Sequence, residues 1–97
     1  MQDRRARENE WSQLMRAAIN GDGAAYQRLL NDLSRVLRAS VRRGLGGADI
    51  ASSDAEDVVQ EVVLAIHLKR HTWDQSKPIG PWIMAITRNK MIDEIRR

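Results

Sequence analysis

Apolar residues recur along the chain at steps of three and four, which is the spacing of one face of an α-helix. The pattern predicts a short first helix, a longer second helix over about residues 23–43, a third over about 53–70 and a fourth over about 82–97. The apolar stripes of the first three helices are Trp11, Leu14, Met15, Ala18 and Ile19; Tyr26, Leu29, Leu30, Leu33, Val36, Leu37 and Val41; and Ala55, Val58, Val59, Val62, Val63 and Ile66. No segment shows the two-residue alternation of a β-strand. The sequence therefore predicts an all-α fold, a compact bundle of about four helices.

Residues that favour helix ends stand at the borders of these segments. In chain order they are Asp22 before the second helix, Gly44, Gly46 and Gly47 after it, Ser53 with Glu56 at the start of the third, and Pro81 in the first turn of the fourth. An aspartate accepts hydrogen bonds from the first free amides of a helix, and a serine with a glutamate three residues later forms a capping box. Glycine ends helices, and proline is tolerated in their first turn.

The third helix has a second face that differs from an ordinary solvated one. At roughly 100° per residue, this face carries acids, an amide and two leucines. They are Asp57, Gln60, Glu61, Leu64 and Leu68. An apolar pair beside polar groups is typical of a docking surface for another helix. Alternatively, a neighbouring helix of the same domain covers the two leucines.

Residues 72–81 contain turn residues and two prolines and are expected to be irregular, with Trp73 and Trp82 at or beside their two ends and Lys77 between. In the helix that follows, the expected core face consists of Met84, Met91, Ile92 and Ile95. The opposite side carries Trp82, Asn89, Asp93 and Arg96, flanked by Ile86, Lys90 and Arg97. Aromatic rings beside basic and amide side chains suit the binding of unpaired bases. The alternative is that both tryptophans cover the core at the ends of the loop.

The 97 residues suffice for one domain, expected over 8–97 after a flexible lead at 1–7. The net charge is only +3, but acids cluster at 54–61 and arginines and lysines gather near the end, so one part could bind nucleic acid and another a basic protein. The chain has no cysteine, no secretory leader and no stretch apolar enough to span a bilayer. We therefore expect a soluble cytoplasmic protein without membrane association.

An enzymatic function is not expected. Glu56, Asp57, Glu61 and His67 could be imagined as metal ligands, but they do not converge on one side of their helix. The sequence also has no glycine-rich phosphate loop and no nucleophile with a neighbouring base. We expect no catalytic residue, no cofactor and no small-molecule substrate.

Two segments carry a resemblance to a known family. Residues 54–62 read DAEDVVQEV, and residues 81–97 read PWIMAITRNKMIDEIRR, with Trp73 and Lys77 in the loop between. This order and spacing resemble region 2 of a bacterial sigma factor of the sigma-70 family, most closely of the extracytoplasmic-function (ECF) class. The C-terminal half matches almost throughout.

The resemblance implies a role in transcription initiation. The acidic helix of such proteins docks on the clamp coiled coil of the β′ subunit of core RNA polymerase, which would make Asp57, Gln60, Glu61, Leu64 and Leu68 polymerase-binding residues. The loop and last helix hold the promoter −10 element as single-stranded non-template DNA, and the implied DNA-binding residues are Trp73, Lys77, Trp82, Arg88, Asn89, Lys90, Asp93, Arg96 and Arg97. An anti-sigma factor that covers the same surfaces is an expected further partner.

Two features depart from the family pattern. Such sigma factors carry a second domain that reads the −35 element, whereas this sequence stops at the end of the first, so we do not expect it to select a full promoter alone. The loop also contains Pro78 and Gly80, where the family often has plain polar residues. A different interpretation is a sigma-like mimic that binds an anti-sigma factor and contacts neither polymerase nor DNA.

Overall fold

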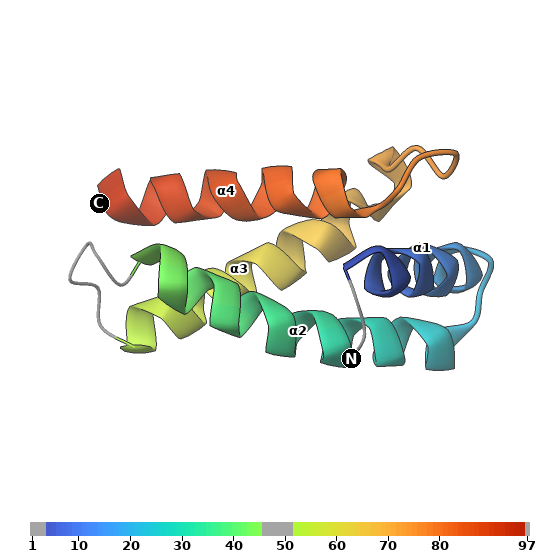
Figure 1. The fold of residues 1–97 in the computed structure, drawn as a ribbon, viewed down its shortest axis with the longest axis horizontal. Coiled ribbons are helices and arrows are strands. Elements are labelled where there is room, and N and C mark those ends of the chain that lie inside the picture. Colours follow the sequence, from blue (N-terminus) through green and yellow to red (C-terminus); the bar gives the residue numbers. More distant parts are fainter. Residues whose placement is uncertain (1–3, 46–51, 97) are drawn as a thin grey trace.

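The computed structural model describes residues 4–45 and 52–96, which form four α-helices and one short 3-10 turn, without a strand (Figure 1). The elements are α1 (Arg4–Ile19), α2 (Gly23–Leu45), α3 (Ser52–Lys69), η2 (Arg70–Thr72) and α4 (Gly80–Arg96). Helix α3 lies between α2 and α4, and α1 packs on the N-terminal half of α2 (Figure 1). The all-α bundle predicted from the apolar spacing is confirmed.

One hydrophobic core joins all four helices. Helix α2 contributes one fully or almost fully buried residue per turn, at Leu29, Leu33, Leu37 and Val41, because a step of four nearly completes a helical turn. The largest share comes from α3, where Ala55, Val58, Val59, Val62, Ala65 and Ile66 are buried. Both stripes match the sequence pattern, and α3 is buried along this side because it has a helix on either flank.

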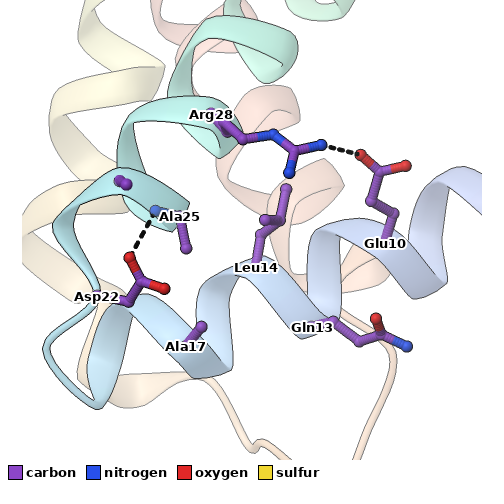
Figure 2. Close-up of a pocket in the computed structure, with 8 residues that line it drawn as sticks. Glu10, Gln13, Leu14, Ala17, Asp22, Ala25 and Arg28 are labelled. Carbon is purple, nitrogen blue, oxygen red and sulfur yellow. Dashed lines mark hydrogen bonds and ion pairs between the residues drawn. The ribbon is translucent and has the colours of Figure 1, made fainter.

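The turn between α1 and α2 explains how the two helices become antiparallel neighbours. Asp22 Oδ1 accepts a hydrogen bond from the Ala25 amide at 3.0 Å, so Asp22 is the N-cap of α2, as its position predicts (Figure 2). Gly21 has φ 103°, a left-handed conformation that glycine adopts without steric conflict. Figure 2 also shows Arg28 of α2 reaching Glu10 of α1, with 3.5 Å between Nη2 and Oε1.

Several helix borders differ from the sequence expectation. Helix α1 begins at Arg4, so residues 4–7 of the expected flexible lead are helical, and residues 1–3 lie outside the described part. Helix α2 continues through Gly44, while Gly46 and Gly47 lie outside the described residues. Helix α4 begins at Gly80, with Pro81 in its first turn as expected.

Glu56, which the sequence pairs with Ser53 in a capping box, forms an ion pair with α2. Arg38 Nε and Nη2 lie 2.8 and 2.9 Å from its two carboxylate oxygens. Helix α3 begins at Ser52, so Ser53 lies in its first turn. The side chain of Ser53 lies outside the described part of the chain, so the capping box itself stays a prediction.

The core face predicted for α4 was wrong. Met84 is 50% exposed, Ile92 and Ile95 are exposed, and Met91 is only partly buried. The buried side is formed by Ile83, Ile86 and Thr87, continuing from Ile79 just before the helix. Both sets lie at helical spacing, so periodicity alone could not choose between them. The packing of α4 on α3 decided the choice.

Candidate functional site

The outward face of α3 presents an uncovered apolar pair. Leu64 is 56% exposed and Leu68 is 69% exposed. Asp57 and Gln60 are also exposed, and Glu61 is half-buried. We call these five residues the α3 docking face. The alternative that another helix of the same domain covers the leucines is thereby excluded for the described part of the chain.

Helix α2 contacts α3 beside the docking face through an ion pair between Arg38 and Glu56. The bidentate contact from Arg38 lowers the pKa of Glu56 below its ordinary value, first through the hydrogen bond and then through the guanidinium charge, and raises that of Arg38. Gln60 adds a smaller lowering of the same Glu56 pKa. The ion pair therefore lies next to the Gln60 position of the α3 docking face.

A second contact between α2 and α3 lies near the far end of the face. The Tyr26 hydroxyl and His67 Nδ1 are 2.6 Å apart, and the two rings stack with centroids 5.8 Å apart. Burial raises the pKa of the Tyr26 hydroxyl, against a smaller opposing influence of the Arg70 charge. Together with the Arg38–Glu56 pair, this contact joins α2 to α3 at two points along α3.

The loop between η2 and α4 is anchored at both ends and exposed between them. Trp73 and Ile79 are buried, whereas residues 74–78 are exposed, including Lys77. Asp74 organises the tip, because its Oδ1 accepts hydrogen bonds from the Ser76 hydroxyl at 2.7 Å and the Ser76 amide at 3.0 Å. These bonds lower the pKa of Asp74.

The structure places Trp73, which the family resemblance assigns to DNA binding, in the core at the start of the loop. The side chain is only 5% exposed, and the guanidinium of Arg16 lies over its ring, 5.4 Å from the centroid. Its indole Nε1 is buried and has no hydrogen-bond partner among the described residues. In this conformation most of the Trp73 side chain packs against the core and Arg16, so its role in DNA binding stays a prediction.

Trp82 lies in the first turn of α4 and is partly buried against the core. Its indole Nε1 donates to the Thr72 hydroxyl at 3.2 Å, and that hydroxyl donates to the Lys69 carbonyl at 2.7 Å. Trp82 therefore ties the start of α4 to the end of α3, while part of its surface stays accessible beside the loop.

The remaining predicted DNA-binding residues share α4 but not one environment. Asn89, Asp93 and Arg96 are exposed, as expected for one outward face. Arg88 is exposed and Lys90 is half-buried. Arg97 lies outside the described residues. The loop leads directly into α4, and the exposed residues named above lie along the helix that extends away from it (Figure 1).

Sequence reasoning missed the contribution of α1. Glu8, Ser12 and Arg16 contact the backbone of the loop, although they are distant from it in the sequence. Their spacing of four residues places them on one face of α1. That spacing is a signal, but nothing in the sequence indicates what this polar face touches.

Other features of the described residues offer little chemistry. An open groove between α1 and α2, about 360 Å³ in volume, is lined by residues that include Glu10, Leu14 and Arg28 (Figure 2). Within residues 4–45 and 52–96, no group of three or more acidic or histidine side chains could hold a metal ion. None of the described helices is long and apolar enough to cross a bilayer.

Comparison with known proteins identifies the family. Residues 25–97 match the Sigma-70 region 2 family. The chain is 45% identical over 84 residues to the protein named ECF RNA polymerase sigma factor SigF of Caulobacter vibrioides, covering 87% of this chain and 45% of that protein. It is 31% identical over 72 residues to the protein named ECF RNA polymerase sigma factor SigM of Bacillus subtilis, covering 74% of this chain and 39% of the relative.

A third relative, the protein named RNA polymerase sigma factor NccH of Alcaligenes xylosoxydans, is 34% identical over 80 residues, which cover 82% of this chain and 41% of the relative. The chain therefore spans less than half the length of these relatives. No solved structure gives a significant match. The family match includes all of α3, the loop and the described part of α4, which carry the resemblance noted in the sequence. The chain belongs to the Sigma-70 region 2 family.

Proposed function

We propose that this chain acts in transcription initiation as the region 2 domain of an alternative sigma factor. In this role the α3 docking face binds the β′ clamp coiled coil of core RNA polymerase. The loop and the exposed face of α4 hold the promoter −10 element as single-stranded non-template DNA. Family membership and the sigma-factor names of the relatives support the general role. The side chains exposed on α3 and α4 support the assignment of polymerase binding to α3 and of DNA binding to the loop and α4.

One observation carries the docking proposal. Leu64 and Leu68 are exposed on a helix whose other side supplies the centre of the core, so their exposure is not a consequence of a poorly packed helix. Two exposed leucines at helical spacing can bind a partner helix, which would remove them from water. Asp57 on the same face favours a basic partner and gives the contact its orientation.

The DNA proposal rests on the residues that α4 exposes. Asn89 can donate and accept hydrogen bonds at a base edge, whereas Arg88 and Arg96 suit phosphates, which position a strand without specifying its sequence. Capturing an extruded base requires unstacking, which costs a few kcal/mol and is offset by contacts in a pocket. The exposed part of Trp82, next to the loop, offers an aromatic surface for such a base.

Titration calorimetry with an isolated β′ clamp coiled coil tests the docking proposal. We expect micromolar binding by the chain and a loss of about 1–2 kcal/mol in Leu64→Ala, because the partner helix would bury the exposed leucine side chain. Met84→Ala is the matched control, because Met84 is an apolar residue of similar exposure on α4. Gln60→Ala is also expected to weaken binding with little effect on folding.

The same titration distinguishes the competing function. A folded chain that does not bind the clamp would contradict the proposal and favour a sigma-like mimic, which binds an anti-sigma factor without contacting polymerase or DNA. Equal losses in Leu64→Ala and Met84→Ala would remove the α3 docking face from the interface. If the proposal holds, an anti-sigma factor would act by covering the same two surfaces.

A further inference from the structure

Three polar side chains of α1 hold the backbone of the loop before α4. Glu8 Oε1 accepts the Gly80 amide hydrogen at 2.8 Å, and Ser12 Oγ accepts that of Ile79 at 3.1 Å. Arg16 donates from Nε and Nη2 to the Gln75 carbonyl, at 3.1 and 2.9 Å. The three side chains are spaced by four residues and therefore form one row along α1.

Each of these contacts is made to the main chain of the loop. The row therefore holds the path of the backbone, whatever side chains the loop carries. The Gln75 carbonyl lies near the start of the exposed tip, and the Ile79 and Gly80 amides lie after its end. The tip at residues 76–78 is thus exposed and lies between hydrogen-bonded backbone groups on both sides.

The close contact between Glu8 and Gly80 is sensitive to a side chain at Gly80. A Cβ atom added at Gly80 would collide with the carboxylate of Glu8. A side chain at this position would therefore require the Glu8 carboxylate to move away from the first amide of α4. A carboxylate at this point also stabilises the helix N-terminus, where free amides and the helix dipole favour negative charge.

We infer that Glu8, Ser12 and Arg16 are positioning residues that set the shape of the base-receiving loop, so that α1 determines base preference without itself contacting DNA; this inference rests on the function proposed above. The physical reason is preorganisation. A loop held in its binding shape loses less conformational freedom when DNA binds than a loop that must be ordered at that moment. A fixed backbone also discriminates between bases, because it cannot reshape itself around the wrong one.

The charge of Glu8 allows an experiment to distinguish anchoring of the loop from a simple electrostatic effect on DNA binding. Removing the negative charge of Glu8 would by itself strengthen binding to a polyanion. Loss of the anchor predicts the opposite for Glu8→Ala, whereas Glu8→Gln loses the charge but keeps an oxygen that accepts the Gly80 amide hydrogen. For the basic end of the row, Arg28→Ala is the matched control for Arg16→Ala, because Arg28 has the same charge but contacts Glu10 and not the loop.

The first measurement is amide hydrogen exchange in the free chain. We expect the Ile79 and Gly80 amides to exchange roughly tenfold faster in Ser12→Ala and Glu8→Ala respectively, a larger change than for the core amides of the same variants, since a lost anchor permits local opening. Glu8→Gln is expected to restore most of the protection of Gly80. Unchanged exchange in both alanine variants would overturn the anchoring itself, irrespective of any DNA binding.

The second measurement is selection from a pool of short single-stranded DNAs with randomised positions, followed by binding titrations. We expect the unmodified chain to enrich a preferred sequence, and Glu8→Ala and Arg16→Ala to bind it roughly 2- to 10-fold more weakly and with reduced preference. Glu8→Gln and Arg28→Ala should keep the preference, and all variants should still bind the β′ clamp coiled coil.

The possible outcomes distinguish a failure of the role inferred for α1 from a failure of the proposed DNA-binding function. An unmodified chain that enriches no sequence would overturn the proposed DNA function. If the unmodified chain enriches a sequence, and Glu8→Ala and Arg16→Ala enrich the same sequence equally well, only the role of α1 would be overturned. Tighter binding by Glu8→Ala would show that the charge of Glu8, and not its anchor, governs the contact with DNA.

Discussion

Arg38 of α2 and Glu56 of α3 form a bidentate ion pair, with Nε 2.8 Å from Oε2 and Nη2 2.9 Å from Oε1. The pair joins the two helices that contribute most of the core, and it lies one turn before Gln60 of the α3 docking face. The ion pair therefore borders the proposed polymerase contact, and Gln60 adds a smaller lowering of the Glu56 pKa.

This pair predicts a specific pH dependence of stability. The pKa of Glu56 is lowered in the folded chain, mainly by the hydrogen bond from Arg38, so the unfolded state binds its proton more readily. The stabilisation is complete above the ordinary pKa of a glutamate and is lost as the pH falls through the lowered value in the folded chain. Glu56→Gln should therefore show a smaller fall of Tm on acidification than the unmodified chain.

Thermal unfolding by circular dichroism over a series of acidic pH values measures this difference. Asp57→Asn is a suitable control, because it neutralises an exposed carboxylate of the same helix. An acid profile of Glu56→Gln that is parallel to that of the unmodified chain would contradict the linkage.

The two buried tryptophans at Trp11 and Trp73 should respond differently to phenylalanine. Each has an arginine over its ring, Arg7 at 5.9 Å and Arg16 at 5.4 Å, and both lose the same volume on substitution. Trp11 Nε1, however, donates to Asp32 at 2.6 Å, whereas Trp73 Nε1 has no partner among the described residues. Trp11→Phe should therefore destabilise the chain by about 1 kcal/mol more than Trp73→Phe.

Urea unfolding of the two variants checks this expectation. The comparison has its own internal control, since the loss of ring volume and most of the cation–π contact is common to both. Equal losses in the free energy of unfolding would mean that the Trp73 indole is hydrogen-bonded after all, for example to a buried water.

Gly80→Ala should destabilise the chain only when Glu8 is present. The added methyl group displaces the Glu8 carboxylate from the Gly80 amide, so the loss should vanish in the Glu8→Ala background. We expect a coupling of about 1 kcal/mol in a double-mutant cycle followed by urea unfolding. Gly23→Ala is the control, because Gly23 also begins a helix and its Cβ would meet open space. Additive effects at Gly80 and Glu8 would argue against the contact.

Asn89 and Arg96 should affect DNA binding in different ways. Both are exposed on α4, so neither substitution should disturb folding. We expect Asn89→Ala to lose about 1–3 kcal/mol of discrimination between the preferred and a scrambled oligonucleotide, as for a side chain that reads a base edge. Arg96→Ala should weaken binding to both and reduce the salt dependence, as for a phosphate contact. Fluorescence anisotropy at several salt concentrations separates the two patterns, and an equal loss on both oligonucleotides in Asn89→Ala would count against base reading.

Much of the fold and part of the candidate site were predictable because they depend on local pattern. The main apolar stripes of α2 and α3 are long and continuous, so their spacing sufficed to place Leu33 and Val62 in the core. The N-cap at Asp22 was also predictable, since a helix terminus needs acceptors within a few residues. The segments 54–62 and 81–97 carry enough of the family pattern for the sequence alone to indicate the family.

What the sequence could not determine was decided by contacts between distant segments. Helix α4 has apolar residues on two sides, and only its packing on α3 buried Ile83 and Ile86 and left Met84 and Ile95 exposed. Trp73 has the same sequence features whether it faces solvent or the core, and the position of Arg16 over its ring follows from how α1 folds back. By itself the sequence determined the helices, the family and the acids and leucines of α3. Only the tertiary structure decided which surfaces stay uncovered and that α1 holds the loop, because hydrogen bonds between segments so distant in the sequence leave no periodic signal in the chain.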